Sequence, residues 1–308
     1  MPHRAVKLSP RKSSSTEALP SGASIFEGVP GTSASFRWHG DRVHYRAMGF
    51  GPPLILVHAP DVGACCVEWR HNIEALAAVY SVFAVDLPGY GLSDIHRGSY
   101  TAEMYVQFLG DFMRVLTGPD TRAIGCVMGA SYLVHVANRW PNLIERLLLI
   151  APGGLASYRP SAFGATTFQM LRLPGVSSAL YGNATSRVAI LEHLQNEIYS
   201  DEALAGPHAV DTRYFVSHRP NADFVECSRL AGLQNIDIAN VTKTMRQPVL
   251  LAWGRQASKP PLADADVFKR ACPHADLVVF ERSATAPHEE EWVRFNQTAL
   301  TFLNGSAK

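Results

Sequence analysis

A turn with the spacing of a catalytic nucleophile carries no nucleophile. In the stretch AIGCVMGASY, which covers residues 123–132, Gly125 and Gly129 stand two residues before and two residues after Val127. Glycines at this spacing let a helix cross close to the preceding strand, and they flank a serine exposed on a sharp turn in enzymes that transfer acyl groups. The isopropyl group of Val127 cannot attack a carbonyl carbon. The spacing therefore predicts the turn, while the residue type excludes its usual reaction.

Two nearby side chains do not replace the missing serine. Ser131 lies one helical turn further on, away from the apex that would expose it. Cys126 is adjacent to the apex, but its side chain should point away from that of Val127. A thiol in apolar surroundings also has a raised pKa. We therefore interpret Cys126 as a core residue.

Short apolar strands and helices alternate around this turn. The runs PLILVH (53–58), SVFAVD (81–86) and RLLLI (146–150) are typical of strands that are covered on both faces. Segments with helical periodicity lie between them. From about residue 152 to residue 247 the pattern is helical and loop-like, without a clear buried strand. The alternation predicts an α/β fold with a mostly parallel sheet and helices on both faces.

The same pattern divides the chain into three parts. We expect a disordered, basic, Ser/Pro-rich tail, a core in two segments, and an inserted helical cap. Their predicted bounds are 1–30 for the tail, 31–152 with 246–308 for the core, and 153–245 for the cap.

Composition narrows the classes of function. A net charge of +1 over 308 residues gives no broad basic field of the kind that nucleic-acid binding needs. No apolar run approaches the roughly 20 residues of a membrane-spanning helix. The five cysteines lack a metal-type spacing and indicate free thiols, so we expect no metal and no cofactor. The tail lacks an apolar segment, so we expect a cytoplasmic protein, with an organelle transit segment as the alternative.

Five motifs occur in the order found in one known superfamily. They are PLILVHAPD, DLPGYGLSD, IGCVMGASYLVHVANRWPNLIERLLLIAPGG, QPVLLAWGRQA and PHEEEWVRFNQTALTFL. In these motifs the chain resembles the α/β-hydrolase superfamily, in its cap-bearing lineage of esterases, epoxide hydrolases, haloperoxidase-like enzymes and plant hormone receptors. The likeness spans about residues 36–303 and implies an eight-stranded, mostly parallel sheet.

The resemblance also implies where a Ser-His-Asp triad would stand. The nucleophile position holds Val127, the acid position holds Ala257, and the base position holds Thr285. His288 matches a second histidine of the family pattern, which is not the catalytic one. One donor of the oxyanion hole would come from Pro60, which has no N–H, whereas the donor from Met128 would survive. Because the triad acts as a unit, these substitutions together indicate a scaffold that has lost its hydrolytic reaction.

Ligands in this superfamily bind at the carboxyl ends of the strands, beneath the cap. We expect the lining there to include seven core residues, and its floor to be much less polar than that of a hydrolase. The hypothesis is that the chain binds an apolar small molecule without hydrolysing it. The expected lining residues are His58, Ala59, Pro60, Asp61, Val127, Met128 and Thr285.

Three alternatives stay open. The first is an enzyme without a covalent intermediate, such as a lyase, an isomerase or a cofactor-free oxygenase, which would use His58, Asp61 or His288. The second is an atypical ester or lipid hydrolase with displaced catalytic groups, for which Cys126 is a candidate. The third is an interaction scaffold with a filled pocket, which leaves room for a protein partner.

The backbone at residue 127 offers a physical check. A nucleophile at this turn has φ above zero, where a β-branched residue is an outlier. Holding Val127 there costs on the order of 1–3 kcal/mol. The sequence therefore predicts one of two outcomes: the turn relaxes to a negative φ, or the strain persists because Gly125 and Gly129 fix it.

Overall fold

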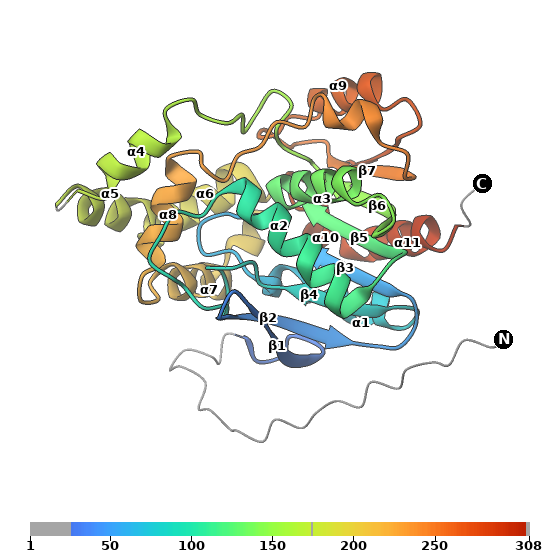
Figure 1. The fold of residues 1–308 in the computed structure, drawn as a ribbon, viewed down its shortest axis with the longest axis horizontal. Helices are drawn as coiled ribbons and strands as arrows, with labels where there is room; N and C mark the ends of the chain where they lie inside the picture. Colours follow the sequence, from blue (N-terminus) through green and yellow to red (C-terminus); the bar gives the residue numbers. More distant parts are fainter. Residues whose placement is uncertain (1–25, 174, 306–308) are drawn as a thin grey trace.

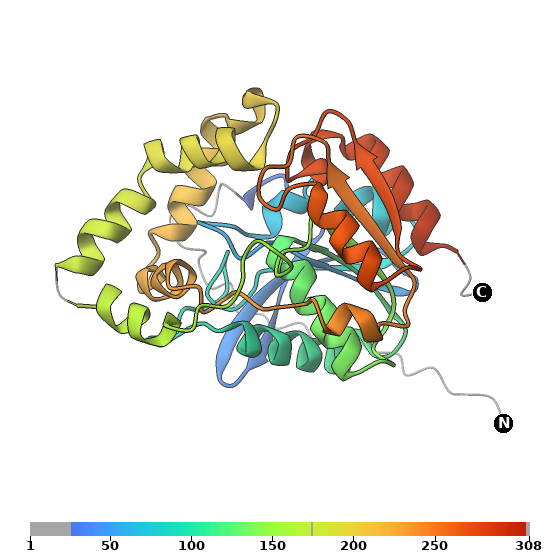
Figure 2. The same cartoon turned by 90° about the horizontal axis from the view of Figure 1, so that it is seen from above.

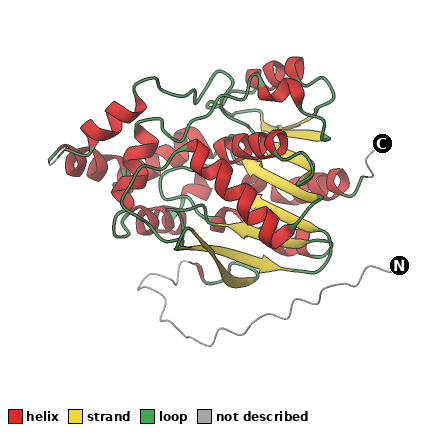
Figure 3. Ribbon diagram, viewed as in Figure 1, coloured by secondary structure: helices red, strands yellow, loops and turns green. Residues whose placement is uncertain are grey.

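One eight-stranded sheet organises the chain. The computed structural model describes residues 26–173 and 175–305, and the order of the strands is β1-β2-β4-β3-β5-β6-β7-β8 (Figures 1 and 3). β2 runs antiparallel to both of its neighbours, and all other pairs are parallel. The predicted mostly parallel α/β sheet is thereby confirmed. The strands are β1 (Thr32–Trp38), β2 (Asp41–Met48), β3 (Pro53–Val57), β4 (Ser81–Val85), β5 (Thr121–Cys126), β6 (Ile144–Ile150), β7 (Val249–Gly254) and β8 (Asp276–Phe280).

Apolar side chains leave both faces of the sheet, as β3 illustrates. Ile55 and Val57 join one buried cluster, whereas Leu54 and Leu56 join the cluster on the opposite face. This alternation follows from the two-residue period of a strand, and it explains why the strand reads as a continuous apolar run. Each face therefore needs its own layer of helices.

Two helical layers cover the two faces (Figure 2). The first cluster takes apolar residues from α2 (Ala102–Phe112), α3 (Val127–Arg139) and α9 (Ala263–Ala271). The second takes them from α1 (Ile73–Ala77) and α11 (Trp292–Leu303). We call these sides of the sheet the α3 face and the α11 face.

A helical insertion separates β6 from β7, in the segment where the sequence predicts a cap. Figures 1 and 2 both place it to one side of the sheet. It packs on the core through a small cluster in which Ile190, Leu194 and Val210 meet the core residues Val62 and Ala286. The helices of the insertion are α4 (Gly164–Leu171), α5 (Val176–Ala184), α6 (Arg187–His193), α7 (Pro207–Ser217) and α8 (Ala222–Leu230).

The N-terminal boundary differs from the expected one. Most of the predicted tail, residues 1–25, lies outside the described residues. Phe26 and Val29, however, are buried in the cluster on the α11 face, so ordered packing begins before residue 31. Within the described ranges, each helix is too short or too polar to cross a membrane.

The DLPGYGLSD motif has a structural task in this fold. The carboxylate of Asp86 accepts hydrogen bonds from the backbone N–H groups of Cys66 and Leu92, at 2.6 Å and 2.9 Å, and contacts Nδ1 of His44 at 2.6 Å. Burial alone would raise the pKa of Asp86, but His44 and these donors lower it to about 2. An ionised, fully bonded carboxylate thus ties the loop after β4 to two other segments.

Candidate functional site

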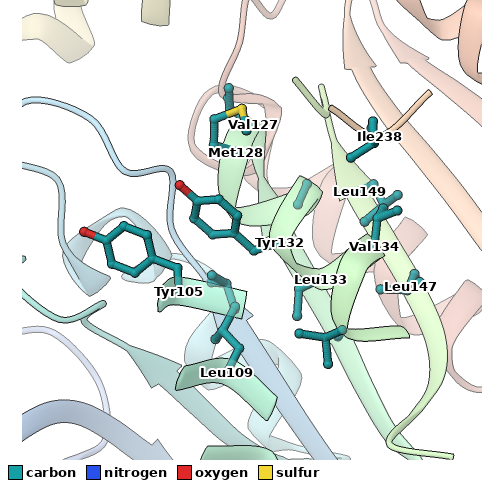
Figure 4. Packing of buried hydrophobic residues seen from close by; sticks show 14 of the residues in the cluster. Tyr105, Leu109, Val127, Met128, Tyr132, Leu133, Val134, Leu147, Leu149 and Ile238 are labelled. Carbon is teal, nitrogen blue, oxygen red and sulfur yellow. The ribbon is translucent and has the colours of Figure 1, made fainter. Parts of the chain in front are cut away.

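The sharp turn between β5 and α3 is intact around Val127. Its φ is +46°, so the predicted relaxation to a negative φ is wrong. A Cβ atom added to Gly129 would lie 2.4 Å from the carbonyl oxygen of His58, and one added to Gly125 would lie 2.8 Å from the backbone nitrogen of Ala130. The close crossing that only glycine permits therefore holds the turn in place, as the second of the two predicted outcomes requires. Figure 4 shows Val127 and Met128 side by side at this turn, at the start of α3.

A cavity of about 400 Å³ lies at this turn, between the core and the insertion. Core residues of the lining follow the ends of β3, β5, β7 and β8, and the insertion supplies the rest. The lining comprises Ala59, Pro60, Asp61, Val62, Val127, Met128, Tyr158, Ala184, His193, Glu197, Ile198, Arg229, Leu230, Gly232, Gln234, Asn235, Lys259 and Thr285.

Six of the seven expected lining residues are present, and His58 is not among them. The His58 ring is fully buried; its Nε2 accepts the N–H of Leu87 at 3.0 Å, and its Nδ1 donates to the carbonyl oxygen of Ala59 at 2.7 Å. Both ring nitrogens thus position backbone. Burial lowers the pKa of His58, which keeps the neutral form that these bonds need. His58 therefore lies outside the lining of this cavity, and both of its ring nitrogens are occupied by backbone groups.

The positions of the general base and its acid hold no titratable group. Thr285 lines the cavity, but its hydroxyl donates to the carbonyl oxygen of Glu197 in the insertion, at 2.7 Å. Ala257 is buried and lies outside the lining. Pro60, which offers no N–H, stands where an oxyanion donor would be needed. The positions that the family resemblance assigns to the base, the acid and one oxyanion donor are therefore held by Thr285, Ala257 and Pro60.

Asp61 lines the cavity, and both of its carboxylate oxygens face positively charged or imidazole groups. Its Oδ2 lies 2.5 Å from Nε2 of His193 and 3.4 Å from Nη1 of Arg213, and its Oδ1 lies 3.8 Å from Nη1 of Arg229. Burial would raise the pKa of Asp61, but His193 and the two guanidinium groups hold it well below its usual range. Asp61 is therefore an ionised anchor for the insertion. His193 and Arg229 escape sequence reasoning because they lie 132 and 168 residues away from it.

Lys259, at the rim of the cavity, differs from the paired Arg229 of the lining. Lys259 is exposed, and its Nζ lies 5.4 Å from the centre of the Tyr158 ring. No carboxylate among the described residues forms an ion pair with it. The cavity thus combines an apolar floor, a wall whose charges are mostly paired, and an amine available to an anion.

Cys126 and His288 lie away from this cavity. Cys126 belongs to the cluster on the α11 face, while Val127 belongs to the one on the α3 face, as expected for a core cysteine. Its Sγ lies 3.7 Å from Nε2 of His288. Burial raises the pKa of Cys126 well above its usual value and lowers that of His288 to about 4. Neither group can act on a molecule at Val127, so their suggested surrogate roles there find no support.

Ser131 is also excluded as a displaced nucleophile. Its hydroxyl is fully buried and lies 2.7 Å from the carbonyl oxygen of Gly153 and 3.1 Å from that of Val127. It therefore bonds backbone behind the turn, as its place in the helix predicts.

Comparison with known proteins agrees with this architecture. The model of the alpha/beta hydrolase family matches residues 54–298. A 2-hydroxy-6-oxononadienedioate/2-hydroxy-6-oxononatrienedioate hydrolase of Burkholderia vietnamiensis is 29% identical over 273 residues, covering 85% of this chain and 91% of the relative. A pimeloyl-(acyl-carrier protein) methyl ester esterase of Vibrio parahaemolyticus is 25% identical over 264 residues, covering 82% and 94%.

A solved structure shares the fold. The meta-cleavage product hydrolase CumD of Pseudomonas fluorescens IP01 superposes with a TM-score of 0.73 at 23% identity, covering 88% of this chain and 97% of that one. Since the family model spans most of the chain, the protein belongs to the alpha/beta hydrolase family.

Proposed function

We propose that this protein is a non-hydrolytic member of its family that binds a small, largely apolar molecule in the cavity at Val127. One observation carries the proposal: the turn keeps its strained, left-handed geometry with φ of +46° while its apex is a hydrocarbon side chain that lines the cavity. Because valine cannot act as a nucleophile, this backbone strain does not serve catalysis. Its retention is explained if the turn now shapes a binding surface.

The lining suggests a ligand with an apolar body and one acidic group. Ala59, Pro60, Val127 and Met128 supply a floor without charge, and the cavity of about 400 Å³ lies in the size range of sites for small organic molecules. Lys259 at the rim can receive an anion. The name of the Burkholderia relative specifies an unsaturated oxo-dicarboxylate, which supports a hydrocarbon chain bearing a carboxylate as the class to test.

Binding is tested with matched acids and amides. We expect aryl-alkanoic acids such as 4-phenylbutyrate to raise the melting temperature in a concentration-dependent way, and the corresponding amide to bind less well. Lys259→Met should reduce the preference for the acid by up to about fivefold, the range of an exposed ion pair. Lys243→Met, at an exposed lysine outside the cavity, serves as the control. Uniform absence of stabilisation across the panel would contradict the proposal.

Loss of hydrolysis is tested separately. The wild-type chain should release no burst of chromophore from activated esters and should not react with a fluorophosphonate probe. If the probe labels the wild type but not Ser131→Ala, the protein is a hydrolase that uses Ser131 as a displaced nucleophile.

A second function is favoured by the pair formed by His193 and Asp61. These two titratable groups lie 2.5 Å apart in the lining of the cavity, and Nδ1 of His193 is 3.6 Å from a carboxylate oxygen of Glu197. Such a pair could move a proton on a bound molecule without a covalent intermediate. Exchange of the protons next to the carbonyl of a bound keto acid, followed by NMR in D₂O, tests this; the reaction should disappear in His193→Gln while binding persists.

A further inference from the structure

We propose that Glu68, Cys126 and His288 form a binding site for a zinc ion on the α11 face of the sheet. The three residues come from η2 (Cys66–Trp69), the end of β5 and α10 (Pro287–Glu290). One ligand atom from each lies within 4.8 Å of the other two. The site is separate from the cavity at Val127, and the inference does not depend on the proposed function.

The distances suit a tetrahedral ion. Nε2 of His288 lies 3.7 Å from Sγ of Cys126 and 3.7 Å from Oε1 of Glu68. With Zn–S near 2.3 Å and Zn–N or Zn–O near 2.0–2.1 Å, tetrahedral geometry places neighbouring ligand atoms about 3.3–3.6 Å apart. Those two edges are therefore within a few tenths of an ångström of the required lengths. Thiolate, imidazole and carboxylate are also ligand types that zinc accepts together.

A buried oxygen with only a thiol as its partner points to a missing group. The Glu68 side chain is only 10% exposed, and apart from the Cys126 thiol its Oε1 has no hydrogen-bond partner among the described residues. Native proteins rarely leave such an atom unsatisfied, and a bound ion is one physical reason for an exception. Among the described residues, the polar groups in contact with the ring nitrogens of His288 are the Cys126 thiol and this carboxylate oxygen. The thiol, the imidazole and the carboxylate oxygen can therefore each still bind a metal ion.

A second group of similar composition shows what a satisfied cluster looks like. His44, Cys66 and Asp86 also lie close together. There, however, Nδ1 of His44 contacts Asp86 at 2.6 Å, and Nε2 contacts the hydroxyl of Ser33 at 2.6 Å. The other oxygen of Asp86 accepts the N–H of Cys66. Because those bonds already fill the ligand positions, this group makes a matched control.

The surroundings give the ion an apolar shell and a route of entry. The Trp69 ring lies 4.6 Å from that of His288, centre to centre, and the Phe295 ring lies 5.9 Å from it. On the other side, Glu68 contributes to the lining of a separate cleft of about 290 Å³ between the core and the insertion. Zinc could enter through this cleft, and a water molecule there would complete the fourth position.

The test is zinc binding by the reduced, tag-free full chain in competition with a chromophoric chelator. We expect one tightly bound ion per chain. Cys126→Ser and Glu68→Gln should each weaken binding by at least about 100-fold, since even outer contacts of a metal site account for 10- to 100-fold. Cys66→Ser should bind zinc like the wild type. Cys272→Ser, which alters a buried thiol 3.4 Å from Nε2 of His274, should do so as well.

Cobalt substitution gives a readout that does not depend on activity. Co²⁺ in the site should produce a thiolate-to-metal charge-transfer band in the near ultraviolet, and that band should vanish in Cys126→Ser. If Cys126→Ser fails to fold, the isosteric Glu68→Gln variant still reports through affinity. Absence of tight binding, or binding that survives both substitutions, would overturn the proposal.

Discussion

Val127 and Cys126 are consecutive residues, yet they face chemically opposite regions of the molecule. At the cavity, the positions where the family resemblance places the nucleophile and the base hold Val127 and Thr285, and the polar residues that remain there are mostly bonded to one another. On the α11 face, Cys126 contacts an imidazole and a buried carboxylate oxygen that has no other hydrogen-bond partner among the described residues. The comparison teaches that a sequence motif locates a turn but not its chemistry. Polar groups that are not already bonded to one another indicate where a ligand can bind.

The largest expected effect concerns the glycine frame on the α3 face. In Gly129→Ala the new Cβ would meet the carbonyl oxygen of His58 at 2.4 Å and that of Val57 at 3.0 Å. Backbone cannot yield like a side chain, so we expect a loss of about 3 kcal/mol or more in the free energy of unfolding. Gly182→Ala is the control, because its Cβ would meet nothing within 4 Å. In urea denaturation, the free energy of unfolding of Gly182→Ala should not fall, and it should rise by up to about 1 kcal/mol.

The second prediction compares two buried glutamates near the α11 face. Glu289 is paired with Nη1 of Arg70 at 2.5 Å and accepts the Tyr199 hydroxyl at 2.8 Å. Glu289→Met should therefore cost about 2–3 kcal/mol, because both partners lose a charged acceptor. Glu68→Met removes a buried oxygen whose hydrogen-bond partner among the described residues is only the Cys126 thiol, so it should be neutral, or stabilising by about 1 kcal/mol.

Denaturation of both variants in a zinc chelator measures this difference. Added zinc should stabilise the wild type and Glu289→Met but not Glu68→Met. Equal losses in the two variants without zinc would show that the Glu68 carboxylate has partners in solution, and would remove the contrast between the two faces.

Much of the architecture follows from the sequence because it depends on local patterns. Apolar runs such as 53–58 and 146–150 identify strands that are covered on both faces, and the spacing of Gly125 and Gly129 identifies the turn. The same local geometry correctly sends the Cys126 side chain away from Val127. Six of the seven expected lining residues follow from their places after strand ends.

The remainder depends on contacts between distant segments. Asp61 meets His193 and Arg213 only because the insertion folds back over the core. Glu68, Cys126 and His288 are separated by 58 and 162 residues, so no spacing rule for metal ligands detects them. The orientation of His58 depends on a similar contact, because its ring accepts the N–H of Leu87, which belongs to another strand connection.

The third prediction uses this buried histidine. Because burial lowers the pKa of His58 in the folded state, the unfolded chain binds more protons below its ordinary value of about 6.5. Its contribution to stability is therefore present above pH 6.5 and is lost as the pH falls toward the lower folded value. The slope from this one group is at most about 1.4 kcal/mol per pH unit. NMR titration of the folded chain should give a pKa for the His58 ring below that of an ordinary histidine, and a pKa at or above the ordinary value would refute this assignment.

The smallest effect compares two valines of α3. Val127 has φ of +46°, whereas Val134 is fully buried within the helix and is not among the residues with positive φ. Val134→Ala should cost about 2 kcal/mol or slightly more, from two buried methyl groups and the space they leave. In Val127→Ala the same loss is offset by relief of the β-branched side chain at positive φ, by about 1 kcal/mol. Val127→Ala should therefore be the milder variant by about that amount in urea denaturation. Equal costs would mean that the turn stores no strain at residue 127, and that its geometry needs no explanation from ligand binding.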